Sequence, residues 1–142
     1  MNQFSKARRK KRQRRGAAAV EFAIVAPLFI MLVFGMIEFG RMVMVQQVIT
    51  NASREGARRA VVDASTIEDV RDVVEKYSAS SSITVPRENI TINPDPAVTA
   101  NGDPITVSVS LPFADISWLP TPQFLESYNL QAVTVMRRDK MP

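Results

Sequence analysis

The feature that most constrains this chain is an uninterrupted apolar stretch close to its N-terminus. From position 22 to position 37, sixteen consecutive residues have side chains without charge or hydrogen-bonding groups. Ten of them are Phe, Ile, Leu or Val, and each such residue contributes about −0.3 to −0.6 kcal/mol to membrane insertion. With residues 17–20 the stretch is, as a helix, about 31 Å long, enough to cross a bilayer. We therefore predict a transmembrane helix over residues 17–40.

A block of positive charge precedes this stretch. Residues 1–16 contain eight Lys and Arg residues and no acid, whereas the rest of the chain has ten basic and 14 acidic residues and sums to −4. Lys and Arg are enriched on the cytoplasmic side of membrane spans, so the block predicts a cytoplasmic N-terminus and an extracytoplasmic C-terminal part. A basic tail can also bind nucleic acid or anionic lipid. Only Phe4 is available to stack on bases, so we expect no nucleic-acid partner.

A cleaved secretory signal is the main alternative for the apolar stretch. Such a signal has a shorter apolar region, followed by a small-x-small cleavage site. The residues that follow here read GMIEFGRMVMV and offer no such site, whereas small residues precede the stretch at positions 16–19. Any processing is therefore expected on the cytoplasmic side of the span.

One carboxylate, Glu21, lies where a membrane span ordinarily has none. Its position near the helix start lets the helix dipole offset part of the cost of burying a charge in lipid. Glu21 is either an interfacial residue without a role or the partner of a cation that forms later. Cleavage after Gly16 would create such a cation, the α-amine of Ala17, on the same or a neighbouring subunit.

The arrangement of basic leader, Gly16, Glu21 and apolar helix resembles the signature of type IV prepilins. The longer run GAAAVEFAIVAPLFIMLVFGMIEFGR, followed by NASREGARRAVV, is similar to TadE-like minor pilins or pseudopilins of the tight-adherence (Flp, type IVb) pilus system. The resemblance covers residues 14–64. It implies that a prepilin peptidase cleaves after Gly16, that Ala17 becomes the new N-terminus, and that Glu21 is the carboxylate that aids pilus assembly.

Helical periodicity continues beyond the span and predicts a stalk helix over residues 41–64. Apolar residues recur there at spacings of four and three on one helix face. This face becomes small at Ala52, Gly56 and Ala60, which lets another backbone approach closely. Its partner is either the chain's own sheet or the helix of another pilin.

The stalk also holds the most recognisable family motif after the span. In the resemblance this motif includes Arg54, Glu55, Gly56 and Arg58, and its role does not follow from the residues. Glu55 and Arg59 have the spacing and order of a favourable helical ion pair. The partners implied by the resemblance are the prepilin peptidase, other pilins or pseudopilins, the pilus assembly machinery and inner-membrane lipid.

Residues 65–142 are expected to form a small extracytoplasmic α+β domain. A helix is predicted to begin with Ser65 or Thr66 as its N-cap, followed by several acids in its first turns. These acids lack the glycine and ligand spacing of a calcium loop, so we expect no metal site.

Further along the chain the apolar period changes to two. Residues 105–111 alternate between apolar and polar, and residues 90–92 and 130–136 are further strand candidates. We expect three or four antiparallel strands that cover the stalk helix, two of them joined in a hairpin-like unit. Residues between 112 and 128 are predicted to form a loop held by burial of Trp118, Leu119, Phe124 and Leu125; the alternative is a surface that binds a partner.

The predicted fold is therefore α+β, with a long pilin-like helix, a short helix and a small antiparallel sheet. The segments are a basic leader (1–16), a span (17–40), a stalk (41–64) and the outer domain (65–142). The chain has no Cys and no His, which excludes disulfides and the usual zinc sites and triads. We expect no enzymatic activity, cofactor or small-molecule substrate.

The predicted function is that of a minor pilin or pseudopilin, cleaved after Gly16, that supports pilus assembly, adhesion and secretion. It would be a single-pass protein of the bacterial inner membrane that could also be incorporated in the pilus. The alternative is an uncleaved single-pass anchor whose outer domain binds a partner.

Overall fold

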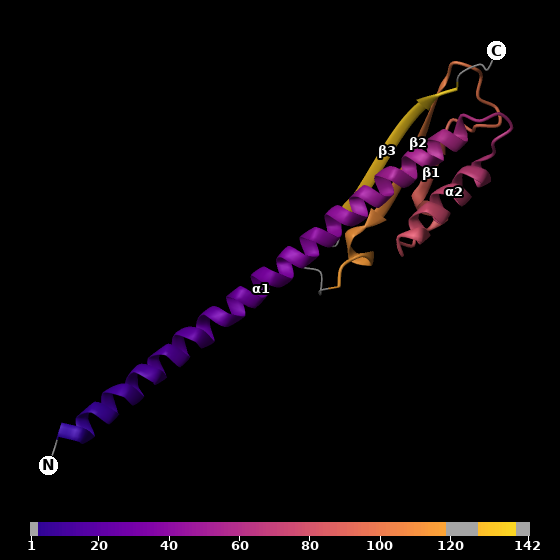
Figure 1. Ribbon diagram of the computed structural model, residues 1–142. Coiled ribbons are helices and arrows are strands. Elements are labelled where there is room, and N and C mark those ends of the chain that lie inside the picture. The colour runs from indigo at the N-terminus through magenta and orange to yellow at the C-terminus, as the bar shows by residue number, and fades with distance from the viewer. Residues whose placement is uncertain (1–2, 119–127, 139–142) are drawn as a thin grey trace. The chain divides into compact units, whose positions relative to one another are not determined.

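A computed structural model describes residues 3–118 and 128–138, with side chains from residue 16 onward (Figure 1). The described elements are, in chain order, α1 (Gln3–Ala60), α2 (Ile67–Ser80), the 3-10 helix η1 (Arg87–Asn89), β1 (Ile90–Asn93), β2 (Pro104–Pro112), the 3-10 helix η2 (Phe113–Asp115) and β3 (Asn129–Arg137). The chain divides into two units, Met1–Phe39 and Gly40–Pro142. The predicted α+β fold is confirmed.

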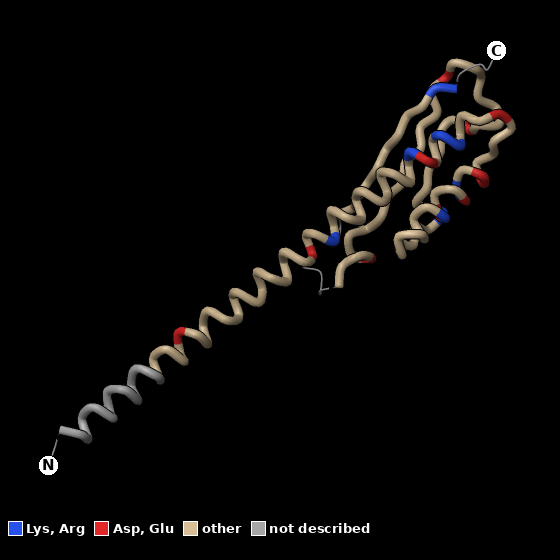
Figure 2. The backbone as a smooth tube through the Cα atoms, in the orientation of Figure 1, with Lys and Arg blue, Asp and Glu red and all other residues tan. Residues whose placement is uncertain are grey.

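The first unit consists of the N-terminal part of α1, which continues without a break through Pro27. Its large apolar side chains are exposed, and Figure 2 shows a long uncharged stretch of this helix. Within the described residues, α1 is the one helix long and apolar enough to cross a membrane. Its most apolar window has a mean hydropathy of 2.4 and is not buried inside the chain at all. So large an apolar surface is typical of a segment that contacts lipid or other helices.

The second unit contains an antiparallel sheet that, among the described residues, has three strands in the order β1-β2-β3. Val107 of β2 lies opposite Ile92 on β1 and Thr134 on β3. Alternate residues of β2 are fully or almost fully buried: Ile105, Val107, Val109 and Leu111. This alternation confirms the strand predicted over residues 105–111. The strand candidates at 90–92 and 130–136 are β1 and β3.

Both helices contribute to the core that covers the inner face of this sheet (Figure 1). From the second-unit part of α1 come Val45, Ile49, Ala52, Ala57 and Ala60, and α2 contributes Val70 and Val74. On the outer face, by contrast, Val133 and Val135 of β3 are exposed. The second unit is therefore a two-layer structure with one covered and one open sheet face.

The ends of the helices follow from local hydrogen bonds. α1 ends at Ala60, four residues before the predicted end of the stalk. In the turn that follows, the Ser65 hydroxyl donates to the Arg59 carbonyl over 2.7 Å. Thr66, one of the two residues predicted for this position, is the N-cap of α2. Its hydroxyl accepts from the Asp69 N–H, and the Asp69 carboxylate accepts from the Thr66 N–H, which completes a capping box.

A buried arginine closes the far end of the sheet. Arg138 directly follows β3 and is only 9% exposed. Its guanidinium donates to the carbonyls of Pro96 (2.9 Å) and Thr99 (3.1 Å) and to the Asp63 carboxylate (3.0 Å). These bonds join the end of β3 to the 94–103 loop and to the turn after α1.

Candidate functional site

The residues of the expected processing and assembly site all lie on α1. Gly16, Ala17 and Glu21 are helical and exposed, and a Cβ added at Gly16 would meet no described atom within 4 Å outside its chain neighbours and the adjacent helix backbone. Ala17 and Glu21 are four residues apart, so they lie on the same face of the helix, one turn from each other. The structure thus places these three residues together at an accessible position.

The small-residue face of the stalk lies against the chain's own second unit. Ala52 and Ala60 are fully buried. A Cβ added at Gly56 would lie 2.6 Å from Val74 Cγ2 on α2 and 3.3 Å from Val107 Cγ1 on β2. The chain's own sheet, one of the two partners considered, therefore lies against this face, together with α2, which was not predicted as a partner. The need for glycine at position 56 follows from this close approach of helix to helix and sheet.

Ser53, which directly precedes Arg54 of the family motif, connects α1 to β3. Its side chain is fully buried, and its hydroxyl donates to the Thr50 carbonyl over 2.8 Å. The hydroxyls of Ser53 and Thr134 are also 2.8 Å apart. Because the single Ser53 hydrogen is directed at Thr50, the Thr134 hydroxyl donates to Ser53. A role for the inward half of the motif is thus packing and hydrogen bonding against the sheet.

The charged half of the motif points away from the core. Arg54 and Arg58 are exposed, and Arg58 pairs with Glu55 at 3.4 Å. The expected pair of Glu55 with Arg59 is wrong, because the Arg59 guanidinium instead lies 3.3 Å from the Asp69 carboxylate of α2. The helix spacing alone could not reveal this partner, which comes from a different helix.

Acidic residues of α2 form ion pairs with an arginine that was not predicted from the sequence. Arg87 of η1 donates to Glu68 and Asp72 at 2.6 Å each and to Glu75 at 2.9 Å. The hydrogen bonds with Asp72 and Glu75 raise the pKa of Arg87 above its ordinary value. Within the described part of the chain, no group of three potential metal-ligating residues is positioned to hold an ion.

A second missed contact joins Arg41, at the start of the second unit, to the segment after η2. The Arg41 Nε donates to the Ile116 carbonyl over 2.5 Å, and its guanidinium lies over the Trp118 ring, 4.5 Å from the ring centre. The expectation that Trp118 is buried is wrong, because this side chain is 72% exposed. The Trp118 ring makes a cation–π contact with Arg41 at the surface and is not packed into the core. The other three side chains expected to hold this loop, at positions 119, 124 and 125, lie outside the described residues.

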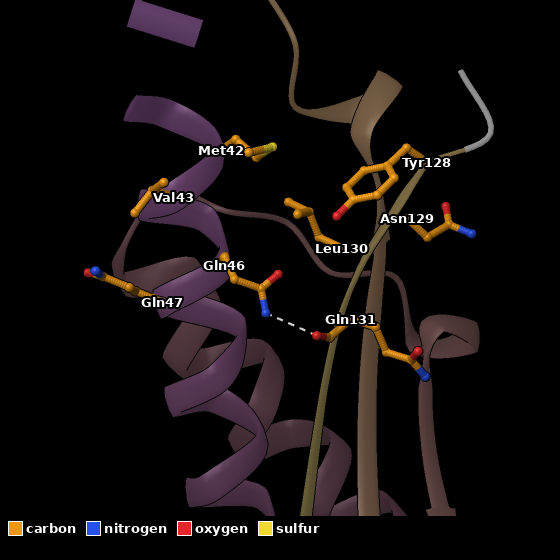
Figure 3. A pocket seen from close by; sticks show the side chains of 8 residues that line it. All are labelled: Met42, Val43, Gln46, Gln47, Tyr128, Asn129, Leu130 and Gln131. Atoms are coloured by element: carbon orange, nitrogen blue, oxygen red, sulfur yellow. Dashed lines mark hydrogen bonds between the residues drawn. The ribbon is translucent and has the colours of Figure 1, made fainter. Parts of the chain in front are cut away.

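A groove of about 490 Å³ lies between α1 and the start of β3. Figure 3 shows Met42 on the helix wall and Tyr128 on the strand wall, with a hydrogen bond of 2.9 Å from Gln46 Nε2 to the Gln131 carbonyl. The described residues that line the groove include amides, a phenol and aliphatic side chains, and none of these described residues is a carboxylate or a basic group. The groove can therefore offer apolar contact and hydrogen bonds to an occupant.

Comparison with known proteins identifies one family. The family model described as TadE-like protein matches residues 16–58, a segment that begins at Gly16 and includes the apolar part of α1 and most of the stalk. No curated protein and no solved structure matches the chain. The match confirms the resemblance that the span and stalk indicate. Over residues 16–58 this chain is similar to TadE-like proteins, a family associated with the tight-adherence pilus system.

Proposed function

We propose that this chain is a minor pilin or pseudopilin of a tight-adherence pilus. α1 would hold it in the bacterial inner membrane, with the basic N-terminus in the cytoplasm and residues 41–142 outside. The observation that carries the proposal is the TadE-like match over residues 16–58, which starts at the residue where a charge of +8 gives way to an apolar helix. The chain would act as a structural subunit and as the substrate of a peptidase, without catalysing a reaction itself.

The first proposed event is removal of residues 1–16 by a prepilin peptidase. A glycine inside a helix is less favourable than alanine by about 1 kcal/mol, so Gly16 weakens α1 locally at this position. Among the described residues beyond its chain neighbours, no side chain lies within 4 Å of a Cβ built at this position, and residues 17–19 are all alanine. These features favour access of a protease to the peptide bond after Gly16.

The second proposed event is pairing of Glu21 with the α-amine that cleavage creates at Ala17. Pairing would neutralise a carboxylate that is costly in lipid. If the amine belongs to the neighbouring subunit, the four-residue separation offsets adjacent helices by about 6 Å along their axes. Because Glu21 is exposed on α1, a neighbouring helix can reach it.

This proposal is tested with two variants in cells that carry the pilus secretion system. Gly16→Leu places a bulky side chain at the cleavage position and is expected to leave the precursor at full length. Glu21→Ala is expected to be inserted and cleaved normally but to reduce the amount of pilus sheared from the cell surface. Glu21→Asp keeps the charge and serves as the matched control.

Two outcomes would contradict the proposal. Piliation that is unchanged by Glu21→Ala would exclude the assembly role of this carboxylate. A protein of unchanged length in the wild type as well as in Gly16→Leu would favour the alternative, an uncleaved anchor whose outer domain binds a partner.

A further inference from the structure

We propose that the end of the second unit that carries Arg41, Trp118 and Tyr128 lies in the lipid headgroup layer of the membrane that α1 spans. This inference rests on the proposed membrane anchoring and adds a second membrane contact, made by the folded domain itself. The occupant of this surface is the phospholipid headgroup region next to the chain's own span.

The first argument is chain connectivity. The predicted span ends at Gly40, and Arg41 is the next residue, so their Cα atoms are about 3.8 Å apart. The indole of Trp118 lies 4.5 Å from the Arg41 guanidinium carbon. Trp118 is therefore separated from the predicted end of the span by no more than the Arg41 side chain and this 4.5 Å contact.

The second argument is the chemistry of the exposed side chains at this end. Trp118 is 72% exposed and Tyr128 is 52% exposed, although large aromatic rings are costly to leave in water. Trp and Tyr are enriched at membrane–water interfaces, where the apolar ring and the polar tip are both satisfied. Met44 on the adjacent turn of α1 is also exposed. Water alone is a poor environment for this set of side chains, whereas a headgroup layer suits each of them.

The third argument is the way Trp118 is held. Arg41 is fixed by its hydrogen bond to the Ile116 carbonyl and supports the indole from one side. The ring is thereby positioned without being buried. The Arg41 cation also suits the phosphate groups of lipids, because guanidinium binds phosphate oxygens through charge-assisted hydrogen bonds.

The experiment uses Trp118 as its own reporter, since it is the single tryptophan of the chain. The full-length protein is placed in nanodiscs of phosphatidylethanolamine and phosphatidylglycerol, at one copy per disc. Trp118 fluorescence is then quenched by a spin label on the lipid headgroup, by a label deep in the acyl chain, and by aqueous iodide. We expect several-fold stronger quenching by the headgroup label than by the deep label, and several-fold protection from iodide relative to the control below.

The matched control moves the tryptophan to the opposite end of the second unit. In the double variant Trp118→Phe, Val98→Trp, the reporter lies in the loop joined to Arg138, where Val98 is 81% exposed. This reporter is expected to be fully accessible to iodide and insensitive to both lipid labels. Equal quenching profiles for the two reporters would overturn the proposal.

The remaining outcomes separate this inference from the proposed anchoring. If the protein remains in the discs but Trp118 is open to iodide and unaffected by lipid labels, the inference fails and the anchoring stands. If Trp118 is protected only in discs with several copies, the surface binds another subunit and the inference also fails. If the protein does not remain in the discs at all, the anchoring itself is wrong.

Discussion

Substitution of Gly56 by alanine tests the packing of α1 against the second unit with a single methyl group. The added Cβ would lie 2.6 Å from Val74 Cγ2, closer than two carbon atoms can approach without displacement. Val74 is fully buried and β-branched, so its side chain is stiff. Helix propensity favours alanine by about 1 kcal/mol, whereas overpacking a core costs about 1–3 kcal/mol. We therefore expect Gly56→Ala to lower the free energy of unfolding by about 0–2 kcal/mol.

A double-mutant cycle isolates the clash. Val74→Ala alone is expected to cost about 2 kcal/mol through lost burial and a cavity, but in the Gly56→Ala background it also removes the methyl group that clashes. The double variant should therefore be more stable than the sum of the single effects by about 1–2 kcal/mol. Gly40→Ala is the control in the same helix, because its Cβ would meet nothing within 4 Å.

The assay is native-state hydrogen exchange of the β2 amides in the full-length protein in detergent micelles. Exchange at these amides reports opening of the sheet that Gly56 packs against. If Gly56→Ala stabilises the sheet and its effect adds to that of Val74→Ala, the close approach at Gly56 does not exist and the reasoning is refuted.

Three further substitutions test other contacts of the second unit. Ser53→Ala should lower the free energy of unfolding by about 1 kcal/mol. In a double-mutant cycle measured by urea unfolding, the loss in Ser53→Ala, Thr134→Val should be smaller than the sum of the two single losses. Asp69→Asn should destabilise α2 at neutral pH, because the backbone N–H of Thr66 lowers the pKa of this carboxyl. The stability that the ionised Asp69 carboxylate contributes is present above its unfolded pKa near 3.8 and is lost as the pH falls through the lower folded pKa. The thermal unfolding temperatures of variant and wild type should therefore converge in acid. Arg138→Ala should lower the free energy of unfolding by about 2–3 kcal/mol, since it leaves the buried Pro96 carbonyl and the partly buried Thr99 carbonyl without their charged donor. Unchanged hydrogen exchange in the 94–103 loop would count against this role.

Much of the fold could be predicted because it depends on local patterns. The sixteen-residue apolar run requires a membrane-length helix, and the alternation over residues 105–111 requires a strand with one buried face. Thr66 could be assigned as one of two caps, since a hydroxyl before an acidic first turn is a local signal. The end of α1 was less predictable, because the turn after Ala60 depends on a hydrogen bond between Ser65 and Arg59.

The missed contacts join residues of different structural elements, and two of them join residues that are far apart in the sequence. Arg41 and Ile116 are separated by 75 positions, as are Asp63 and Arg138. The spacing within one helix therefore favoured Glu55 as the partner of Arg59, whereas the packing of the helices selects Asp69. Trp118 was expected in the core for a similar reason, because the sequence shows an aromatic residue but not the cation that holds it at the surface.

The most direct test of the central claim is the mass of the N-terminal peptide of the protein extracted from the membranes of its own cells. Cleavage after Gly16 predicts a mature chain that begins at Ala17, has lost all eight basic residues of the leader and retains the apolar part of α1. An N-terminal peptide that still contains Met1, or a cut on the C-terminal side of the span, would contradict the claim.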